Sequence, residues 1–317
     1  MNTTVESLKR INYRLFFSVL ISRLLPIVYT TLRISFLGNL PDTWGFNIAS
    51  QIAWVNLIYE VVFEALLLPI FHLLGKKLSD EKEFQNRVRT GLILFAAVYA
   101  VLSTLISIFA YPLVSGMAQQ QEIIHATVDY IRMETVAIML SSIYRFAIIV
   151  FIVLQRDKLI YVLLTVQMLL TVLFDSLFIS ELNISLNLGV NGVALSNMIV
   201  NTALIVFSLY LFQRLGIRVF RTIKDTSLTW IKEWFRLGSL SGLESFVRNL
   251  AFILMILRMV NVVNQQGVFW VTNNFIWGWL LLPVLSLGEI IKRDAAENPG
   301  SIGYLSKGFF ALTGLFI

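Results

Sequence analysis

The chain has 317 residues, of which 57% are hydrophobic and 14% charged, and its mean hydropathy is +0.77. Soluble domains are usually about 45–50% apolar and about 25% charged, so the composition excludes an ordinary soluble protein. There is no cysteine, which excludes disulfides, thiolate metal sites and cysteine nucleophiles. The apolar runs exceed the roughly 18 residues that mark a transmembrane helix, and they predict an all-α polytopic membrane protein.

The net charge of +6 is explained by where the basic residues lie. Of the 25 Lys and Arg, 19 lie in alternate loops or at their edges, whereas the intervening loops, around Asp42, Gln119, Glu181 and Gln265, contain none. This positive-inside pattern predicts a bacterial-type cytoplasmic membrane protein with a cytoplasmic N-terminus. It also accounts for the positive charge without a nucleic-acid partner.

Eight apolar segments are long enough to cross a bilayer, and a turn at 39–42 separates the first two. The predicted helices cover about residues 14–37, 47–74, 90–113, 126–154, 159–180, 192–212, 236–262 and 268–291. A ninth segment begins near Gly308 and the chain stops inside it, so we expect either a fragment or a protein whose second lobe comes from elsewhere. We therefore expect about nine transmembrane helices.

The connection at 213–235 differs from the other loops, because it is basic and too polar to span. Its aromatic residues Trp230, Trp234 and Phe235 interleave with charged ones, a pattern that suits a helix lying in the membrane interface. The connection is predicted to separate an N-lobe, residues 1–212, from the start of a C-lobe, residues 236–317.

The two predicted lobes resemble each other. Arg23 and Arg33 lie ten residues apart in the first helix, and Arg248 and Arg258 lie ten apart in the seventh. The sequence Leu-Leu-Leu-Pro at 66–69 recurs at 280–283. Internal symmetry of this kind is typical of transporters, whose binding sites lie near the interface between the repeats.

Eleven arginine and carboxylate side chains are singled out away from the ends of the predicted spans, where charge is costly unless it faces a protein interior or a wet cavity. An outer layer holds Arg33, Arg132, Glu134, Asp175 and Arg258, and a middle-to-inner layer holds Arg23, Glu60, Glu64, Arg145, Glu244 and Arg248. Together the two layers contain six arginines and five carboxylates. This near balance predicts pairing inside the bundle, around a polar central cavity.

Spacing predicts some of these pairs. Glu244 and Arg248 are separated by four residues with the acid first, the favourable order on a helix. Glu60 and Glu64 have the same spacing, so either arginines from neighbouring helices lie between them or one of them is protonated. Arg23 is the predicted partner of Glu60. A fixed structural salt bridge is the alternative reading for any single pair.

The eighth segment carries a different kind of candidate. Trp277 and Trp279 lie well inside it, beside Asn273 and Asn274. They are predicted either to line a cavity that takes planar or cationic ligands by stacking or to serve ordinary bundle packing. Pro283 could kink this helix.

The sequence resembles the MATE (multidrug and toxic compound extrusion) transporters of the multidrug/oligosaccharidyl-lipid/polysaccharide flippase superfamily. The resemblance rests on the run from Tyr130 to Asn201, and also on 28–38, 75–83 and 235–246. It implies twelve helices in two six-helix lobes and alternating access. It further implies efflux of amphipathic, often cationic, compounds driven by inward Na⁺ or H⁺.

The chain departs from the family pattern at the residues expected to bind the coupling ion. Arg33 stands in the pattern Tyr29-x3-Arg33-x4-Gly38, where the family commonly has an acid, and the helix 7 acid of some members falls closer to Arg248 than to Glu244. Asp175 matches the family acid of helix 5. Glu60, Glu64 and Glu134 therefore become candidates for the coupling role.

These features predict a monomeric, cation-coupled antiporter of small organic molecules, without a cofactor other than Na⁺ or H⁺. A flippase for a lipid-linked pyrophosphate sugar is the first alternative, because arginines in helices 1 and 7 would suit a pyrophosphate. Alternatives of another class are a transport-incompetent fragment and a membrane enzyme. For the enzyme the sequence supplies no nucleophile–base pair, metal cluster or phosphate loop.

Overall fold

The computed structural model describes residues 2–39, 44–219, 227–297 and 302–316, and the predicted turn at 39–42 lies mostly outside this range. All the regular elements of the described residues are helical. The α-helices are α1 (Asn2–Arg10), α2 (Tyr13–Gly38), α3 (Gly45–Ser50), α4 (Ile52–Gly75), α5 (Glu81–Ile108), α6 (Ala110–Gly116), α7 (Ile124–Val153), α8 (Asp157–Phe178), α9 (Val190–Arg214), α10 (Ile231–Phe252), α11 (Arg258–Val262), α12 (Gln266–Asn274), α13 (Leu282–Glu297) and α14 (Ile302–Phe316). The 3₁₀-helix η1 (Gln121–Ile123) and the π-helices η3 (Ile253–Leu257) and η4 (Phe275–Leu280) complete the order.

Seven of the described helices are long and apolar enough to cross a membrane, and an eighth span is bent. The chain is thus an all-α polytopic membrane protein, as predicted, and the described residues contain up to eight full spans and a shorter ninth apolar helix. The ninth segment is the 15-residue α14, which begins at Ile302 instead of near Gly308. Its apolar part, Leu305–Phe316, is shorter than the other spans.

The predicted helix at 268–291 is broken in the structure. It consists of Gln266–Leu280 and Leu282–Ile291, with a 52° bend between them. Pro283 follows the break directly, as expected for a residue that removes a backbone donor and clashes with the preceding turn. The kink predicted at Pro283 is confirmed.

The helices form two compact units. One unit contains residues 35–269, and the other contains residues 1–34 together with 270–317. Both units cross the predicted lobe boundary at 213–235, of which residues 220–226 lie outside the described range. The division into two lobes stays a prediction.

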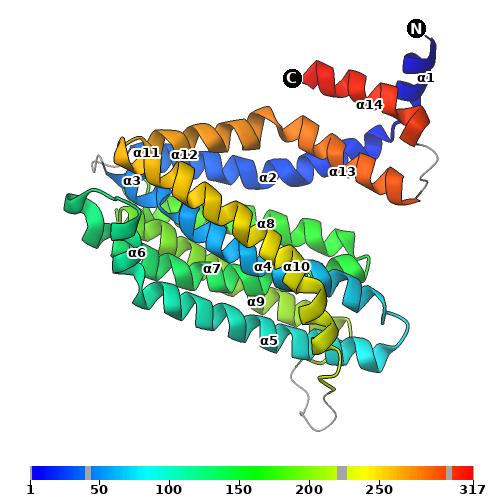
Figure 1. The fold of residues 1–317 in the computed structure, drawn as a ribbon, viewed down its shortest axis with the longest axis horizontal. Coiled ribbons are helices and arrows are strands. Elements are labelled where there is room, and N and C mark those ends of the chain that lie inside the picture. Colours follow the sequence, from blue (N-terminus) through cyan, green and yellow to red (C-terminus); the bar gives the residue numbers. More distant parts are fainter. Residues whose placement is uncertain (1, 40–43, 220–226, 298–301, 317) are drawn as a thin grey trace. The chain divides into compact units, whose positions relative to one another are not determined.

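The larger unit is a bundle in which α10 runs along α4, and α7 lies beside α5 and α9 (Figure 1). Two glycines on α10, Gly238 and Gly242, face Ala65 on α4. A Cβ at Gly238 would lie 1.8 Å from the Ala65 carbonyl oxygen, and one at Gly242 would lie 2.7 Å from the Ala65 Cβ. This small-xxx-small pattern lets the two backbones approach closely, as is usual between membrane helices.

Two tryptophans at the end of the 213–235 connection, where an interfacial helix was predicted, are packed inside the protein. Trp230 and Trp234 are buried and stacked on each other, with ring centroids 5.0 Å apart. Their indole nitrogens donate to Thr90 Oγ1 (3.2 Å) and to the Leu66 carbonyl (2.7 Å). The start of α10 is therefore anchored on α4 and α5, and Phe235 is the exposed member of the three.

The smaller unit has its own core, where α1 and α14 pack on α2 and α13. Phe16, Leu287, Ile290 and Phe309 are among the buried residues of this cluster. Ser7 ties α1 to α14, because its hydroxyl donates to the Leu305 carbonyl and accepts from the Gly308 amide. The polar N-terminal residues thus form a helix that the sequence did not predict.

Candidate functional site

A group of four charged side chains lies along the contact between α4 and α10. Glu60 and Glu64 lie one turn apart on α4, and Glu244 and Arg248 lie one turn apart on α10. Helical residues four apart share a face, so each helix presents two of these groups on one side. We call these four residues the Arg248 cluster.

Arg248 is the centre of this cluster. Its Nη2 donates to Glu64 Oε1 at 2.7 Å and lies 3.7 Å from Glu60 Oε1, while its Nη1 lies 3.6 Å from Glu244 Oε1. One guanidinium is therefore shared by three carboxylates, and the cluster has a formal charge of −2. The Glu64 side chain is the most buried of the three carboxylates, at 19% exposed.

Two of the sequence predictions are confirmed here. Glu244 and Arg248 form the expected ion pair along one helix. An arginine from a neighbouring helix also lies between Glu60 and Glu64, and it is Arg248. The structure thus has the first of the two arrangements expected for this glutamate pair, an arginine from a neighbouring helix between them.

Backbone and hydroxyl contacts fix the α4–α10 contact on both sides of the Arg248 cluster. The Ser241 hydroxyl donates to the Glu64 carbonyl at 3.0 Å, and Asn249 Nδ2 donates to the Leu57 carbonyl at 3.0 Å. The two helices therefore cannot slide without breaking these bonds. The ion pairs between them are held in a defined register.

Arg23 pairs with an acid that the sequence did not single out. Its Nη2 lies 3.0 Å from Glu289 Oε1 on α13, within the same unit, whereas Glu60 belongs to the other unit and its predicted pairing with Arg23 stays a prediction. Glu289 was not among the sequence candidates. The signal was present but ambiguous, because Glu289 lies just before Lys292 and Arg293 and reads as part of a charged loop edge.

The Arg23–Glu289 and Arg248–Glu64 pairs join equivalent helices of the predicted repeat. Arg23 joins the first predicted helix to the eighth, and Arg248 joins the seventh to the second. Each pair thus links the first helix of one repeat to the second helix of the other. This pairing supports the repeat that the spacing of the arginines predicted.

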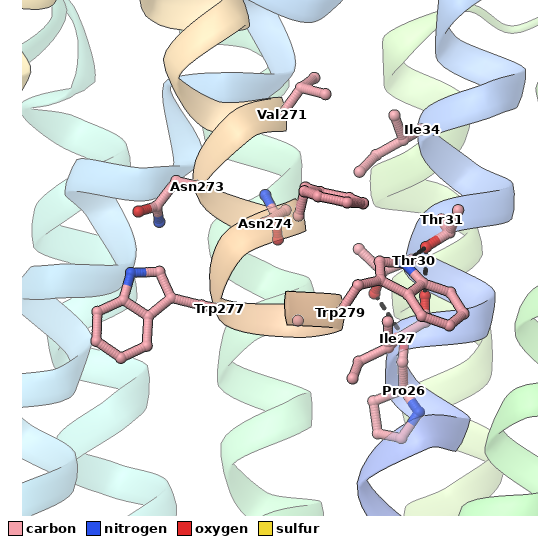
Figure 2. Close-up of a pocket in the computed structure, with 12 residues that line it drawn as sticks. Pro26, Ile27, Thr30, Thr31, Ile34, Val271, Asn273, Asn274, Trp277 and Trp279 are labelled. Carbon is pink, nitrogen blue, oxygen red and sulfur yellow. Dashed lines mark hydrogen bonds between the residues drawn. The ribbon is translucent and has the colours of Figure 1, made fainter. Parts of the chain in front are cut away.

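The smaller unit contains a pocket of about 340 Å³ between α2 and the π-helix η4 (Figure 2). Asn273, Asn274, Trp277 and Trp279 are among its lining residues, as predicted for a cavity in the eighth segment. Trp279 lies over α2 and donates from Nε1 to Thr31 Oγ1 at 2.8 Å. Figure 2 shows Trp277 projecting to the opposite side of η4, beside Asn273.

This pocket offers aromatic and amide groups to a ligand. Asn274 Nδ2 is held by the Trp270 carbonyl at 2.9 Å, whereas Trp277 is 57% exposed. The π-helix behind the pocket is a conformation that occurs frequently at functional sites. An exposed indole beside amide groups can stack on a planar ligand and bond its polar edge.

The two buried carboxylates of the larger unit lie apart from the Arg248 cluster. Glu134 on α7 is buried and accepts from Asn197 Nδ2 at 2.8 Å. Asp175 on α8 is only 1% exposed. Glu134 and Asp175 are set on helices packed against α9, not on α4 or α10.

The remaining arginine candidates bind backbone or aromatic groups. Arg132 donates from Nε to the Ser107 carbonyl at 3.3 Å and lies 3.9 Å from Asp129. Arg145 lies over the Phe63 ring, 5.6 Å from its centroid. Arg258 donates from Nε to the Gly116 carbonyl at 3.3 Å, and Arg33 is half-buried on α2. The described contacts thus place the ionisable residues in separate groups, and the single polar cavity stays a prediction.

No protein-family model matches the chain, and no curated protein is detectably similar to it in sequence. Its fold, however, matches solved structures. The Vibrio cholerae MATE transporter VcmN in its bent form superposes with a TM-score of 0.67 at 14% identity, over 100% of this chain and 72% of that one. An outward-facing multidrug resistance MATE transporter of the MOP superfamily gives 0.62 at 14%, over 98% and 80%.

The chain has the fold of the MATE transporters. A further MATE structure, in complex with MaD3S, agrees, with a TM-score of 0.59 at 15% identity over 96% of this chain and 78% of that one. The resemblance predicted from the sequence motifs is confirmed at the level of the fold. In this MATE-type fold, the Arg248 cluster lies on the second and seventh predicted helices.

Proposed function

We propose that the protein is a secondary transporter that exports small amphipathic organic compounds in exchange for a cation, by alternating access. The observation that carries this proposal is Arg248 shared by Glu60, Glu64 and Glu244 within membrane-spanning helices of a MATE-type fold. Intramembrane charges are costly, and they mark substrate and ion pathways.

The composition of the Arg248 cluster suits binding of a positively charged species. Three carboxylates around one guanidinium leave two negative charges uncompensated, so a proton, Na⁺ or an organic cation lowers the electrostatic energy of the cluster. An incoming cation also competes with Arg248 for Glu64. Proton or Na⁺ binding and substrate binding thus exclude each other at the same carboxylates, which is the requirement for antiport.

The pocket beside η4 has an aromatic lining that suits planar ligands. Trp277 is an exposed aromatic surface within a lining that is otherwise mostly apolar. Such surfaces bind the planar parts of amphipathic cations by stacking and cation–π attraction. This supports the proposed class of substrate.

The flippase alternative is weaker for a structural reason. A flippase for lipid-linked pyrophosphate needs arginines free to hold the phosphates, yet Arg23 is paired with Glu289 and Arg248 is surrounded by three carboxylates. Binding a pyrophosphate at Arg248 would place more negative charge beside an already negative group. We therefore prefer export of neutral or cationic compounds.

The proposal includes the setting predicted from the sequence. We place the protein in a bacterial-type cytoplasmic membrane, with a cytoplasmic N-terminus and acting as a monomer. The alternation of basic and uncharged loops supports this orientation. The coupling ion, H⁺ or Na⁺, is a matter for experiment.

Efflux of a fluorescent organic cation from cells that lack their own exporters tests the proposal. We expect export to stop when an uncoupler or Na⁺ removal collapses the driving gradient, and Glu64→Gln to reduce it at least about tenfold, a loss of about 1.4 kcal/mol. Glu233→Gln is the matched control, because Glu233 pairs with Lys76 near the other end of α10. Export that continues after both the H⁺ and the Na⁺ gradient have been removed would contradict the proposal.

A further inference from the structure

The α4–α10 contact has a second flank, opposite the Arg248 cluster. The contact itself runs through Leu57 and Ala65 on α4 and through Asn249 on α10. Glu64 and Arg248 directly precede the contact positions Ala65 and Asn249, whereas Ile58 and Leu250 directly follow Leu57 and Asn249. Since successive helical residues are rotated by about 100°, the two sets lie on opposite sides of the contact.

A cavity of about 490 Å³ lies on this second flank, between α4, α6 and the stretch from α10 into η3. Its walls include Ile58 and Val62 on α4, Leu113 on α6, and Leu250 and Leu254. This volume is within the roughly 300–1,000 Å³ of small-molecule sites. The walls are hydrocarbon, so an occupant must be hydrocarbon too.

The few polar groups in the cavity walls are already bonded. Asn249 Nδ2 donates to the Leu57 carbonyl, and the Trp54 indole donates to Gln51 Oε1 at 3.1 Å. A polar ligand would find no partner from these two groups, and burying its polar atoms without partners is costly. The cavity interior therefore selects against polar molecules.

The positively charged side chain of Arg258 lies at one end of this apolar cavity. Arg258 follows Leu254 by one turn, and its Nε donates to the carbonyl of Gly116, itself a wall residue. Among the described residues, no carboxylate lies within ion-pair distance of its guanidinium. Nη1 and Nη2 remain available for a ligand.

The π-helix η3 explains why Arg258 points to this flank. Ten residues of regular α-helix would rotate Arg258 by about 280° from Arg248, whereas the extra residue of a π-turn reduces this to about 180°. Arg258 then faces the side opposite the Arg248 cluster, where Leu250 and Leu254 line the cavity. The hydrogen bond to Gly116 agrees with that rotation.

We propose that this cavity binds an acyl chain of an anionic membrane phospholipid, with the headgroup phosphate on Arg258. An apolar cavity with a cation at its end is complementary to an amphiphilic anion, and arginine binds phosphate through two parallel hydrogen bonds. Phospholipid surrounds the membrane-spanning helices α4 and α10. The site is independent of the proposed transport function, because it lies on the flank away from the Arg248 cluster.

Lipid binding to the purified full chain in mild detergent, followed by native mass spectrometry, tests this proposal. The probes are phosphatidylglycerol and phosphatidylcholine with identical acyl chains. We expect the wild type to prefer phosphatidylglycerol about tenfold, and Arg258→Gln to abolish the preference while phosphatidylcholine binding persists. Arg132→Gln is the matched control, because Arg132 also donates from Nε to a backbone carbonyl and lies outside the cavity walls.

A second pair of variants fills the cavity from either wall. Leu250→Trp and Ile58→Trp are each expected to remove binding of both lipids, and either suffices if the other fails to fold. Equal binding of the two lipids by the wild type would overturn the proposal, as would an equal effect of Arg258→Gln and Arg132→Gln. Inorganic phosphate that displaces phosphatidylglycerol and binds the filled variants equally well would show a simple anion site and would also overturn it.

Discussion

At the scale of single residues, Arg248 determines what the cluster can do. The three carboxylates lie at different distances from it: Glu64 is hydrogen-bonded at 2.7 Å, whereas Glu244 and Glu60 lie at 3.6 and 3.7 Å. Glu64 also has its backbone carbonyl bonded to Ser241. These differences predict unequal roles for the three acids.

Glu64→Gln should therefore impair export more than Glu60→Gln or Glu244→Gln. The amide keeps the size of the side chain but loses a charge-assisted hydrogen bond. The free energy of unfolding should therefore also fall by about 1 kcal/mol. Dye efflux and thermal melting of the three purified variants provide the comparison. Equal defects in all three would show that only the total charge of the cluster matters.

Local spacing explains which residue contacts the sequence could predict. The Glu244–Arg248 pair follows from one helix with four-residue spacing, and the need for an arginine between Glu60 and Glu64 follows from like charges on one face. Arg23–Glu289 depends on how two helices are rotated against each other, which spacing within a helix does not contain. Glu289 adds a sixth acid to the five that the sequence analysis singled out, which then equal its six arginines.

At the scale of the elements, α10 packs on α4 through glycines whose role can be tested. Gly238→Ala places its Cβ against a backbone oxygen that cannot move aside, so we expect a loss of about 1–3 kcal/mol of stability. Gly288→Ala on α13 is the control, since a Cβ there meets nothing within 4 Å. Thermal melting in detergent measures both variants, and equal melting temperatures would contradict the close approach.

A second substitution separates the two glycines. The Cβ added by Gly242→Ala meets the side chain of Ala65, whereas that added by Gly238→Ala meets its carbonyl. Ala65→Gly should therefore rescue Gly242→Ala and leave Gly238→Ala unstable. Rescue of both, or of neither, would contradict this contact geometry.

The aromatic residues at the start of α10 supply another test. Trp234 is fully buried and bonded to the Leu66 carbonyl, whereas Phe235 is 51% exposed. Trp234→Ala should cost about 3–5 kcal/mol of stability, and Phe235→Ala far less. Denaturation in mixed micelles compares the two. Similar losses would favour the interfacial helix that the sequence first predicted.

The elements show where prediction from sequence stops. The predicted helices at 126–154, 159–180 and 192–212 agree with α7, α8 and α9 to within two residues, because long apolar runs bounded by charged loops are a strong signal. The helix predicted at 90–113 is wrong at both ends, since α5 runs from Glu81 to Ile108 and its charged first turns read as loop in the sequence. The interleaved Trp230 and Trp234 look the same in sequence whether the helix faces lipid headgroups or protein. The π-helices η3 and η4 have no distinctive composition, so neither was predicted, although both lie beside pockets.

At the scale of the whole molecule, two ion pairs would each link one predicted repeat to the other. Arg248 on the seventh predicted helix binds Glu64 on the second, and Arg23 on the first binds Glu289 on the eighth. Alternating access requires that contacts between repeats break and reform, and ion pairs can do so without leaving a packing defect. We therefore propose that Arg248 and Glu64 take part in the transport cycle and do not only stabilise the fold.

Reversing the Arg248–Glu64 pair in proteoliposomes tests this central claim most directly. The double variant Arg248→Glu with Glu64→Arg keeps an ion pair between α10 and α4. It moves the positive charge from α10 to α4 and the negative charge from α4 to α10. We predict near wild-type melting, together with loss of gradient-driven uptake of an organic cation under both an H⁺ and an Na⁺ gradient. Wild-type uptake by the reversed pair would contradict the account and leave Arg248–Glu64 a purely structural contact.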